Sequence, residues 1–518
     1  MRPSDGAGRA AVREATARAL GREPHEIAGD LPFTAQGLDP LRAIRLVRDL
    51  GEALSLDLPA TVAYDFPTPD RLAAHLLTRY GNTPARPEPV VERWPLSRGQ
   101  SVMYRDQRRC PESAAYNLPL LFEIHGALDE AALERAVRAQ AEIHPVLGAL
   151  FEEQGGVPRM TVTPGRAPSF HRLRLTAASR PGQLAELRAL VDVPFDLTTG
   201  PLVRAHLLTL PDRRRLLLIT AHHILLDGTS TAILIRTLKE AYRGERGRAG
   251  ATYGDFVDWE EAMLAGERGA RHRDHWLRRL AGPRPALALP YDRPYDARRL
   301  PRVAVLTSRV SPERTGALGA VARAHRVSVA TVFFAAYVRL LRRLTGQDDL
   351  VLGMTTAARY EKRFQDVVGQ IANCLPLRCE DTGGLPRLLR SVQREMVAAI
   401  EHGACPLPEI ARSLGAGGGP LVSTNFLFQN FEGAEVLGDG GRAEYGALDL
   451  RPFDDLPYAG EYPLALEFYR DGAGYKSFLK YDTHVFDEST ARKMLDEWNA
   501  VLGEFATDSS GEIDGRSA

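Results

Sequence analysis

The sequence lacks the features that mark disulfide-stapled, nucleic-acid-binding or membrane proteins. Its four cysteines are too few and too irregularly spaced for a disulfide framework or a zinc site of Cys-x-x-Cys pairs. The 66 basic residues equal the 66 acidic residues, so no field of one sign can hold a nucleic-acid backbone or an anionic membrane surface. There is neither a signal-peptide core nor a run of ~18 apolar residues. We therefore expect a cytoplasmic protein with no nucleic-acid and no membrane partner.

A chain of 518 residues is too long for one hydrophobic core, so we expect several folding units. Apolar residues recur with helical spacing in residues 11–20, 41–54 and 69–77, which predicts a small all-α unit over residues 1–80. Prolines cluster between residues 84 and 89, a composition that favours an extended spacer. We place a linker at residues 81–93.

Apolar strands and amphipathic helices then alternate, which indicates an α/β fold. We expect strands at 118–124, 216–221, 349–354, 421–429 and 462–469, and helices at 129–143, 231–242, 327–344, 385–402 and 488–505. A proline-rich passage at residues 282–294 divides this region into two lobes, residues 94–280 and residues 281–506. The polar tail at residues 507–518 is expected to be frayed and disordered.

Two adjacent histidines carry the strongest chemical signal. The uniformly apolar run Leu216–Ala221 predicts a buried strand that ends on His222 and His223. Successive side chains on a strand point to opposite faces, so one imidazole should face a cleft and the other should face packing. A neutral imidazole in a cleft can accept a proton or a hydrogen bond from an attacking nucleophile near pH 7.

Asp227 and Gly228 follow just before the next predicted helix, and Asp-Gly favours a tight turn. Gly228 would let the backbone approach a ligand closely, while Asp227 would orient a ring nitrogen or pair with an arginine of the other lobe. We expect no metal here, because strand geometry separates the two imidazoles. His272 and His275 have metal-like spacing, but they lie in a charged helical segment and are expected on a solvated face.

The run from His222 to Gly228 resembles the HHxxxDG signature of nonribosomal peptide synthetase condensation domains. The resemblance extends in order from about Trp94 to Phe505, and motifs of this family are matched by Pro95–Gln100, His144–Leu147 with Phe151, Phe195–Leu197 with Gly200–Leu202, Tyr253–Phe256 with Trp259, Leu289–Pro294, Val368–Asn373 with Leu375–Arg378, and Tyr481–Thr483 with Phe486–Asp487. The resemblance implies two chloramphenicol-acetyltransferase-like lobes arranged in a V, with the site at their junction.

By this resemblance, His223 corresponds to the catalytic histidine and His222 supports it. Asp227 takes a structural role and pairs with Arg359, which matches the family's second-lobe arginine, while Gly228 and Asn373 belong to the matched motifs. Phosphopantetheine arms of partner carrier proteins enter the site. The chain itself binds no cofactor covalently. Whether His223 acts as a full general base or positions the nucleophile and stabilises the tetrahedral intermediate is left open by the sequence.

Three positions depart from the family pattern. Ile143 and Gly148 stand where the second motif usually has arginines, so local salt bridges or donor-side contacts should differ. Thr229 replaces the frequent aromatic after Asp-Gly and would widen the mouth near His223. The segments 373–377 and 426–429 resemble condensation domains that take L-configured or achiral, polyketide-type donors more than they resemble those that follow an epimerase.

Residues 10–80 resemble an acyl or peptidyl carrier protein, with Pro40 where that family has its phosphopantetheine-bearing serine. Proline has no hydroxyl to form the phosphodiester, yet it is well tolerated in the first turn of a helix. We therefore expect a pseudo-carrier domain that keeps the fold without the chemistry. It would act either as a stabilising appendage or as a docking surface for an upstream synthase or a true carrier.

The resemblance implies an acyltransferase that acts in trans and joins a carrier-bound polyketide or peptidyl thioester to an amine or hydroxyl acceptor. A soluble acceptor would make this step a chain release. The alternative is a non-catalytic recruitment platform for synthase partners, but a scaffold has no physical need for an imidazole that faces a cleft. An epimerase of the same fold is less favoured, because the chain has no competent carrier to present an aminoacyl arm in cis.

Overall fold

The computed structural model describes most of the chain in two compact units, residues 1–90 and residues 91–518. The described residues are 5–38, 42–43, 46–47, 49–50, 58, 62–80, 92–163, 165–245, 250–284, 286–380, 383–415, 420–429, 448–453 and 460–507. Pro40, residues 81–91 of the predicted linker and the tail from residue 508 lie outside them. No helix among the described residues is long and apolar enough to cross a membrane.

The first unit is helical in its described part. Its elements are α1 (Asp5–Leu20), η1 (Pro24–Glu26), α3 (Val62–Asp65) and α4 (Pro69–Tyr80). Val12 of α1 and Leu72 of α4 are fully buried in one small core together with Phe33. The helices expected near residues 11–20 and 69–77 are therefore present, whereas the one expected at 41–54 lies largely outside the described residues.

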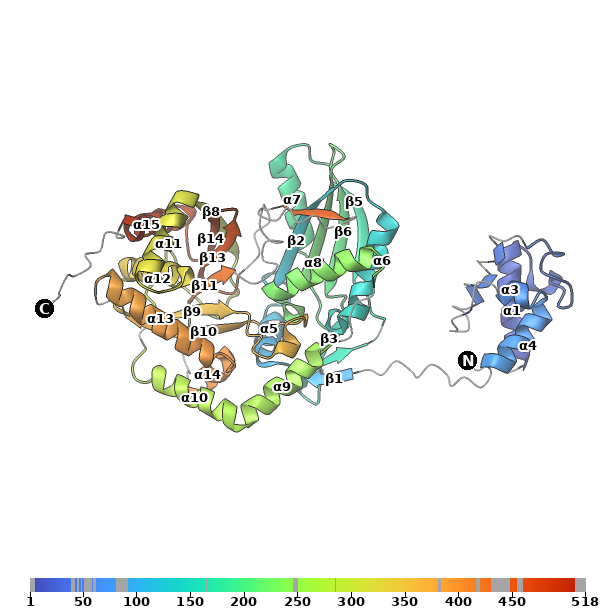
Figure 1. The fold of residues 1–518 in the computed structure, drawn as a ribbon, viewed down its shortest axis with the longest axis horizontal. Helices are drawn as coiled ribbons and strands as arrows, with labels where there is room; N and C mark the ends of the chain where they lie inside the picture. Colours follow the sequence, from blue (N-terminus) through green and yellow to red (C-terminus); the bar gives the residue numbers. More distant parts are fainter. Residues whose placement is uncertain are drawn as a thin grey trace. The chain divides into compact units, whose positions relative to one another are not determined.

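The first half of the second unit is built on a five-stranded sheet of order β12-β2-β7-β6-β5. Its strands are β2 (Asn117–His125), β5 (Ser169–Arg174), β6 (Val203–Thr209), β7 (Arg215–His222) and β12 (Asp449–Pro452). Strand β7 is central, and its register aligns Ile219 with Leu120 of β2 and with Ala205 of β6. The short strand β12 comes from the second half of the chain, so the two sequence halves share this sheet (Figure 1).

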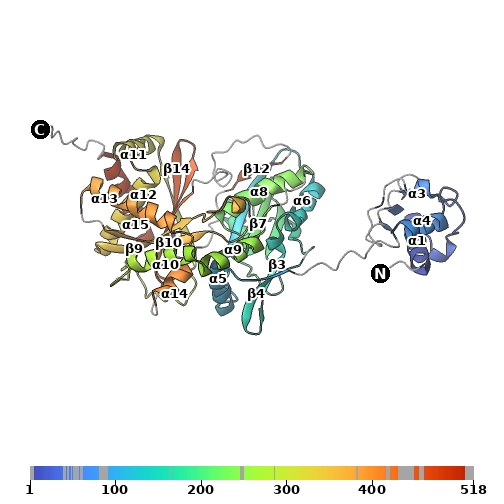
Figure 2. The ribbon, with the colours of Figure 1, turned by 60° about the horizontal axis from the view of Figure 1, so that its bottom comes forward.

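Both faces of this sheet are covered, which explains the uninterrupted apolar run in β7. Leu217 and Ile219 belong to the core that also contains residues of α6 (Glu130–Ile143) and α8 (Gly228–Tyr242), and these two helices lie side by side (Figure 2). Leu216 and Leu218 pack instead with residues of α7 (Arg180–Val191). The sheet thus holds the end of β7 rigidly between two packed layers.

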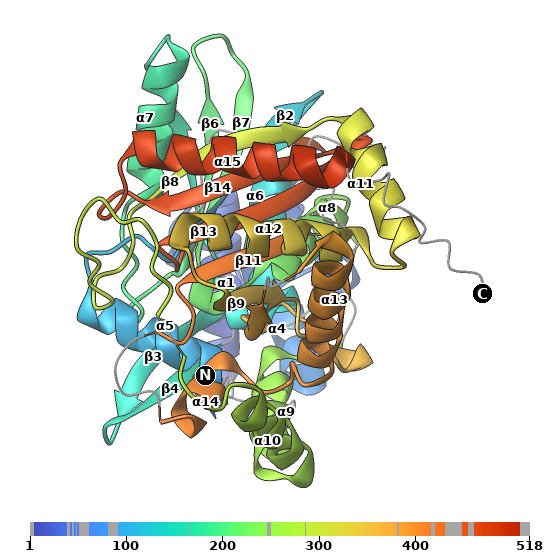
Figure 3. The ribbon, with the colours of Figure 1, turned by 90° about the vertical axis from the view of Figure 1, so that its left-hand side faces the viewer.

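The second sheet has six strands in the order β10-β9-β11-β13-β14-β8. Their bounds are β8 (Val303–Val310), β9 (Asp349–Thr356), β10 (Asn373–Glu380), β11 (Thr424–Gln429), β13 (Leu464–Asp471) and β14 (Gly474–Asp482). Helices α11 (Pro312–Ala324), α12 (Val329–Thr345), α13 (Leu385–Glu401) and α15 (Glu488–Thr507) pack beside this sheet. Figure 3 shows α12 and α15 lying across its strands. The side chains of β13 alternate, with Leu466 and Phe468 buried in the core beneath these helices.

The remaining described elements join the two halves. They are a three-stranded sheet of β1 (Glu92–Pro95), β4 (Val157–Val162) and β3 (Ala149–Gln154), the helices α5 (Arg98–Arg109), α9 (Tyr253–Ala265), α10 (Glu267–Arg279) and α14 (Leu407–Ser413), and the short turns η2 (Pro145–Gly148), η3 (His223–Leu225) and η4 (Lys362–Phe364). Helices α9 and α10 run in succession from the side of the first sheet to that of the second (Figure 1). Phe256 of α9 lies in the first core, whereas Trp276 of α10 lies in the second.

Candidate active site

His222, the last residue of β7, is fully buried and braces the turn that follows. Its Nδ1 accepts a hydrogen bond from the backbone N–H of Ile224 at 3.1 Å, and its Nε2 lies 3.3 Å from Oε1 of Gln107. Burial lowers the pKa of His222 to about 3, so the ring is neutral near pH 7. With Nδ1 accepting, the single proton of the neutral ring resides on Nε2 and is donated to Gln107.

His223 faces the other way and lines a large cavity, as the strand alternation predicts for one of the two rings. Its backbone N–H donates to the carbonyl oxygen of Tyr116 at 2.8 Å, which fixes the start of η3 against the residue just before β2. The cavity has a volume of about 870 Å³, within the usual range for ligand sites. An imidazole on the wall of such a space can meet a reactant, and His222 cannot.

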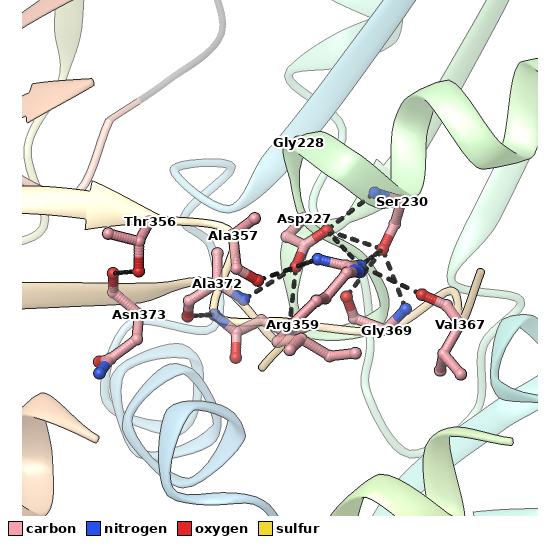
Figure 4. Close-up of polar contacts among 12 residues, drawn as sticks. Asp227, Gly228, Ser230, Thr356, Ala357, Arg359, Val367, Gly369, Ala372 and Asn373 are labelled. Carbon is pink, nitrogen blue, oxygen red and sulfur yellow. Dashed lines mark hydrogen bonds and ion pairs between the residues drawn. The ribbon is translucent and has the colours of Figure 1, made fainter. Parts of the chain in front are cut away.

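Asp227 is the buried centre of a hydrogen-bond network that joins the two halves (Figure 4). Arg359 donates to both carboxylate oxygens at 3.0 Å, and the side chains are 5% (Arg359) and 1% (Asp227) exposed. The backbone N–H groups of Ile371 and Ala372 donate to Oδ2 at 3.0 and 2.8 Å. The expected pairing of Asp227 with an arginine of the second half is therefore present.

The protonation state of Asp227 follows from these contacts. Burial alone raises the pKa of Asp227, but the charge and hydrogen bonds of Arg359, with further bonds from Ser230, outweigh it and hold the pKa below its ordinary value. The carboxylate is thus ionised and fully engaged near pH 7. It organises the junction and is not poised to take a proton from a reactant.

The Asp-Gly pair does not form the expected tight turn. Asp227 is instead the N-cap of α8 and accepts a hydrogen bond from the Ser230 N–H at 2.8 Å. Gly228 is the first residue of the helix, and a Cβ there would lie 3.5 Å from the Gln429 side chain, an ordinary contact. An aspartate directly before a helical apolar pattern is a standard capping signal, so the sequence did contain this information.

Ser230 was missed by the sequence reasoning, although it ties α8 to the second half. Its hydroxyl lies 2.8 Å from Oδ1 of Asp227, accepts the N–H of Gly369 at 3.0 Å and accepts from Arg359 at 3.0 Å. Gly369 also packs directly on the ring of Tyr253, where an added Cβ would come within 1.8 Å of a ring carbon. The Tyr253 hydroxyl in turn lies 2.9 Å from both the Ser97 hydroxyl and the carbonyl oxygen of Gln370, which accepts from it.

Asn373 supports the loop between α13 and α14. Its Nδ2 donates to the carbonyls of Gly403 and Cys405, each at 2.9 Å, and its Oδ1 accepts from the N–H of Leu407 at 3.0 Å. Asn373 lines a separate small cavity of about 30 Å³ rather than the large one. The geometry gives this residue a scaffolding position.

The large cavity lies between the two sheets and is mainly apolar. Its wall is formed by residues of β2, α7, the start of α8, the end of β9, β11, β13, β14, β8, α12, α13 and the end of β12 with the residue after it, among them Leu118, Leu120, Phe122, Leu184, Met354, Phe426, Phe428, Phe453 and Phe478. Thr229, which we expected to widen the opening near His223, also lines this cavity. Polar side chains interrupt this wall at several places, among them Arg188, Ser328, Gln429, Glu467, Tyr469 and Lys480.

Glu461 is a second acid in the electrostatic surroundings of His223. Glu461 is exposed to solvent, but the surrounding protein desolvates its carboxyl and raises the pKa of Glu461. The neighbouring His223 lowers this pKa, whereas Asp106 raises it further. Asp106 itself accepts a hydrogen bond from the Tyr116 hydroxyl at 2.9 Å. No motif in the sequence singled out Glu461, since a lone Glu beside a strand has no distinguishing spacing.

His272 does not lie on a solvated face, contrary to expectation. It is buried, its Nδ1 is 3.1 Å from Nδ1 of His402, and the His402 ring stacks on His275 at 3.8 Å between centroids. Burial lowers the pKa of both His272 and His275 to about 4. Within the described residues, no group of three or more His, Cys, Asp or Glu side chains could hold a metal ion.

Comparison with known families identifies most of the chain. Residues 90–515 match the family model of the condensation domain. The chain belongs to the condensation-domain family. Residues 10–76 match the model of the phosphopantetheine attachment site, so a carrier-type region precedes the condensation domain.

Two curated relatives illustrate the similarity. Polyketide synthase PksN of Bacillus subtilis is 30% identical over 429 residues, which cover 80% of this chain and 8% of PksN. Tyrocidine synthase 2 of Brevibacillus parabrevis is 28% identical over 493 residues, which cover 93% of this chain and 13% of that synthase. The chain thus spans less than a fifth of the length of these relatives.

Solved structures establish the condensation-domain fold. The condensation domain of the Monacolin K polyketide synthase MokA superposes with a TM-score of 0.70 at 21% identity, covering 81% of this chain and 99% of that one. The first condensation domain of the calcium-dependent antibiotic synthetase gives 0.68 at 23% identity, covering 82% and 99%. The predicted fold class, a mixed α/β condensation domain preceded by a carrier-type helical region, is confirmed.

One departure from the family pattern has a steric cause. A Cβ at Gly148, where the second motif usually has arginine, would lie 2.7 Å from the backbone carbonyl oxygen of Arg166. Only glycine fits there without a backbone shift. An arginine at position 148 of this chain would therefore require the backbone to shift.

Proposed function

We propose that the condensation domain catalyses acyl transfer from a carrier-bound thioester to an amine or hydroxyl acceptor, with His223 as the catalytic residue. The observation that carries this proposal is the position of His223 on the wall of an apolar cavity of about 870 Å³ between the two sheets. The buried, neutral His222 and the saturated Asp227 hold the turn on which His223 sits. They supply rigidity, and His223 supplies the reactive group.

The chemical step follows from the groups in the cavity. The acceptor nitrogen or oxygen attacks the thioester carbonyl, and a tetrahedral intermediate forms. His223 accepts or orients the proton of the attacking group. The carbon–sulfur bond then breaks, the amide or ester forms, and the proton passes to the departing thiolate of the phosphopantetheine arm. A soluble amine or alcohol acceptor makes this step a chain release.

The donor is proposed to arrive on another protein. Pro40 stands at the place of the phosphopantetheine serine, and without a hydroxyl the carrier-type region cannot form the phosphodiester that holds the arm. The arm that enters the cavity then belongs to a partner acyl or peptidyl carrier protein. The carrier-type region itself is proposed to serve as a docking surface for an upstream synthase.

The absence of a competent serine is directly testable. The full chain is incubated with coenzyme A and a broad-specificity phosphopantetheinyl transferase, and intact mass is measured. We expect no added arm on the native chain and one arm on the Pro40→Ser variant, because the substitution restores the missing hydroxyl. A phosphopantetheinylated native chain would contradict the pseudo-carrier assignment.

The transfer is tested with acylated carriers and a panel of amines and alcohols, and products are detected by mass spectrometry. We expect product only when an acceptor is present, since thioester cleavage is coupled to acceptor attack. The competing hypothesis, a non-catalytic recruitment platform, predicts carrier binding without acceptor-dependent product. The intact His223 in an accessible cavity favours the enzyme.

A further inference from the structure

The cavity wall contains a buried ion pair, formed by Lys480 and Glu467. Lys480 on β14 donates to Oε1 of Glu467 on β13 at 2.7 Å, and the hydroxyl of Tyr469 lies 3.3 Å from Oε2 of the same carboxylate. The side chains of Lys480 and Glu467 are 5% and 8% exposed, and both line the cavity. The sequence reasoning did not single out any of these residues.

The register of the sheet explains why these side chains face the cavity. Glu467 pairs with Phe478 of β14 and with Leu427 of β11, and these partners line the cavity as well. The intervening residues Leu466 and Phe468 point to the other face and pack in the core. The side chains of β13 therefore alternate between the core and the cavity, and this alternation places the charged pair on the cavity side.

Stability does not account for this pair. Taking two charges out of water costs several kcal/mol per ion, about as much as their attraction returns, so a buried ion pair can be replaced by apolar residues with little loss. The register partners of Glu467 on the adjacent strands, Leu427 and Phe478, are apolar and also line the cavity, which makes apolar residues sterically suitable here. In ligand cavities of this size, a small number of placed polar groups set orientation and specificity.

We propose that Lys480, Glu467 and Tyr469 form a subsite that recognises a hydroxyl or keto oxygen on the acyl chain of the donor. The inference rests on the proposed function and names its substrate class, an oxygenated and otherwise aliphatic acyl chain. The pair presents a donor and an acceptor together and has no net charge. A neutral oxygen can hydrogen-bond to it, whereas a charged group would be desolvated without compensation.

The position of the subsite sets where that oxygen lies. Gly228, close to His223 in the chain, faces Gln429 at the end of β11. Strands β13 and β14 are the first and second neighbours of β11, which puts the subsite about 5–10 Å across the sheet from β11. The recognised oxygen is therefore expected several bonds from the thioester carbonyl and not on the carbon next to it.

The experiment measures binding, so that it does not depend on turnover. Non-hydrolysable amide analogues of decanoyl-pantetheine, one unsubstituted and others with a hydroxyl at successive odd carbons, are titrated calorimetrically into the full chain. We expect one hydroxylated analogue to bind about ten-fold tighter than the unsubstituted one. The double variant Glu467→Leu/Lys480→Met replaces the pair by apolar side chains and should reduce that ratio to within about two-fold.

Two further variants guard against trivial outcomes. Tyr469→Phe removes one hydroxyl, with little risk to folding, and should lower the preference partially. The control Arg343→Met/Glu497→Leu removes a 2.8 Å ion pair between α12 and α15, away from the cavity, and should leave the preference unchanged. Thermal unfolding of each variant verifies that it is folded.

The outcomes separate this inference from the proposed function. Equal binding of all analogues by the native chain, or a preference that survives in the Glu467→Leu/Lys480→Met variant, overturns the subsite. If the corresponding thioesters give no acceptor-dependent product, the proposed transfer fails even where the binding preference is found. If product forms but no analogue is preferred, the subsite alone fails.

Discussion

At the scale of single residues, Asp227 determines how the junction is held. Its two oxygens accept hydrogen bonds from Arg359, Ser230, Ile371 and Ala372, and the Arg359 guanidinium supplies the facing positive charge. A buried carboxylate that loses its cation is left uncompensated in a region of low polarity. The pairing is therefore a point where one substitution has a large effect.

We predict that Arg359→Met lowers the free energy of unfolding by about 3–5 kcal/mol, because it leaves Asp227 buried without its counter-ion. Chemical denaturation of the full chain, followed at the unfolding transition of residues 91–518, measures this loss of free energy. The matched variant Arg343→Met breaks partly exposed pairs with Glu497 and Glu504 and should cost less than about 1 kcal/mol per pair. Equal losses in both variants would show that Asp227 does not depend on Arg359.

The sequence indicated some of these residues and not others, for physical reasons. The strand alternation indicated that one of the two imidazoles faces a cleft and the other faces packing, because period two is a local property, and His223 lines the cavity while His222 is buried. The tight turn expected at Asp227 was wrong, because Asp227 instead caps α8 by accepting a hydrogen bond from the Ser230 N–H, and this depends on where the helix begins. Glu461 could not be found locally, because His223 and Asp106 are distant from it in the chain. The Lys480–Glu467 pair could not be found either, because which face of β13 and β14 lines the cavity depends on the rest of the fold.

At the scale of elements, close backbone approach fixes how the segment after η4 meets α9. Gly369 packs on the Tyr253 ring with no room for a Cβ, whereas Gly503 in α15 has open space at that position. The same substitution should therefore have opposite effects at the two sites.

We predict that Gly369→Ala lowers the free energy of unfolding by about 1–3 kcal/mol or more through overpacking. Gly503→Ala should raise it by about 0.5–1 kcal/mol, because alanine loses less backbone entropy in a helix. Thermal and chemical unfolding of the two variants, side by side, test this. A destabilising Gly503→Ala or a neutral Gly369→Ala contradicts the packing described.

Long periodic elements were predictable and short non-local ones were not. The helices at α12, α13 and α15 and the strand β7 were expected within a few residues of their observed bounds, because each has a long apolar pattern. Strand β12 has four residues and pairs with β2 across more than half of the condensation domain. Nothing in its own sequence marks it as part of the first sheet.

At the scale of the whole molecule, buried neutral histidines couple stability to pH. Burial lowers the pKa of His144 and His206 to about 4 and that of His222 to about 3. In the unfolded chain these groups titrate near 6.5. Below that pH the unfolded state binds more protons than the folded state, so acid favours unfolding.

We predict that the contribution of these buried histidines to the free energy of unfolding is constant above about pH 7. Between about pH 6.5 and 4 the free energy of unfolding should fall, by up to about 1.4 kcal/mol per pH unit for each such histidine. Urea denaturation across this interval measures the slope. The His144→Gln variant should show a shallower slope, because Gln does not titrate. A slope unchanged in that variant would contradict the assignment of a neutral buried ring.

The central claim is that His223 performs the transfer inside the cavity between the sheets. The most direct measurement compares the native chain, His223→Ala and the control His171→Ala, an exposed histidine on β5, in product formation from an acylated carrier and an acceptor. We expect product with the native chain and with His171→Ala, and a loss of about 10²–10⁴-fold with His223→Ala. Unchanged product yield with His223→Ala, while the carrier still binds, would contradict the account and favour the recruitment platform.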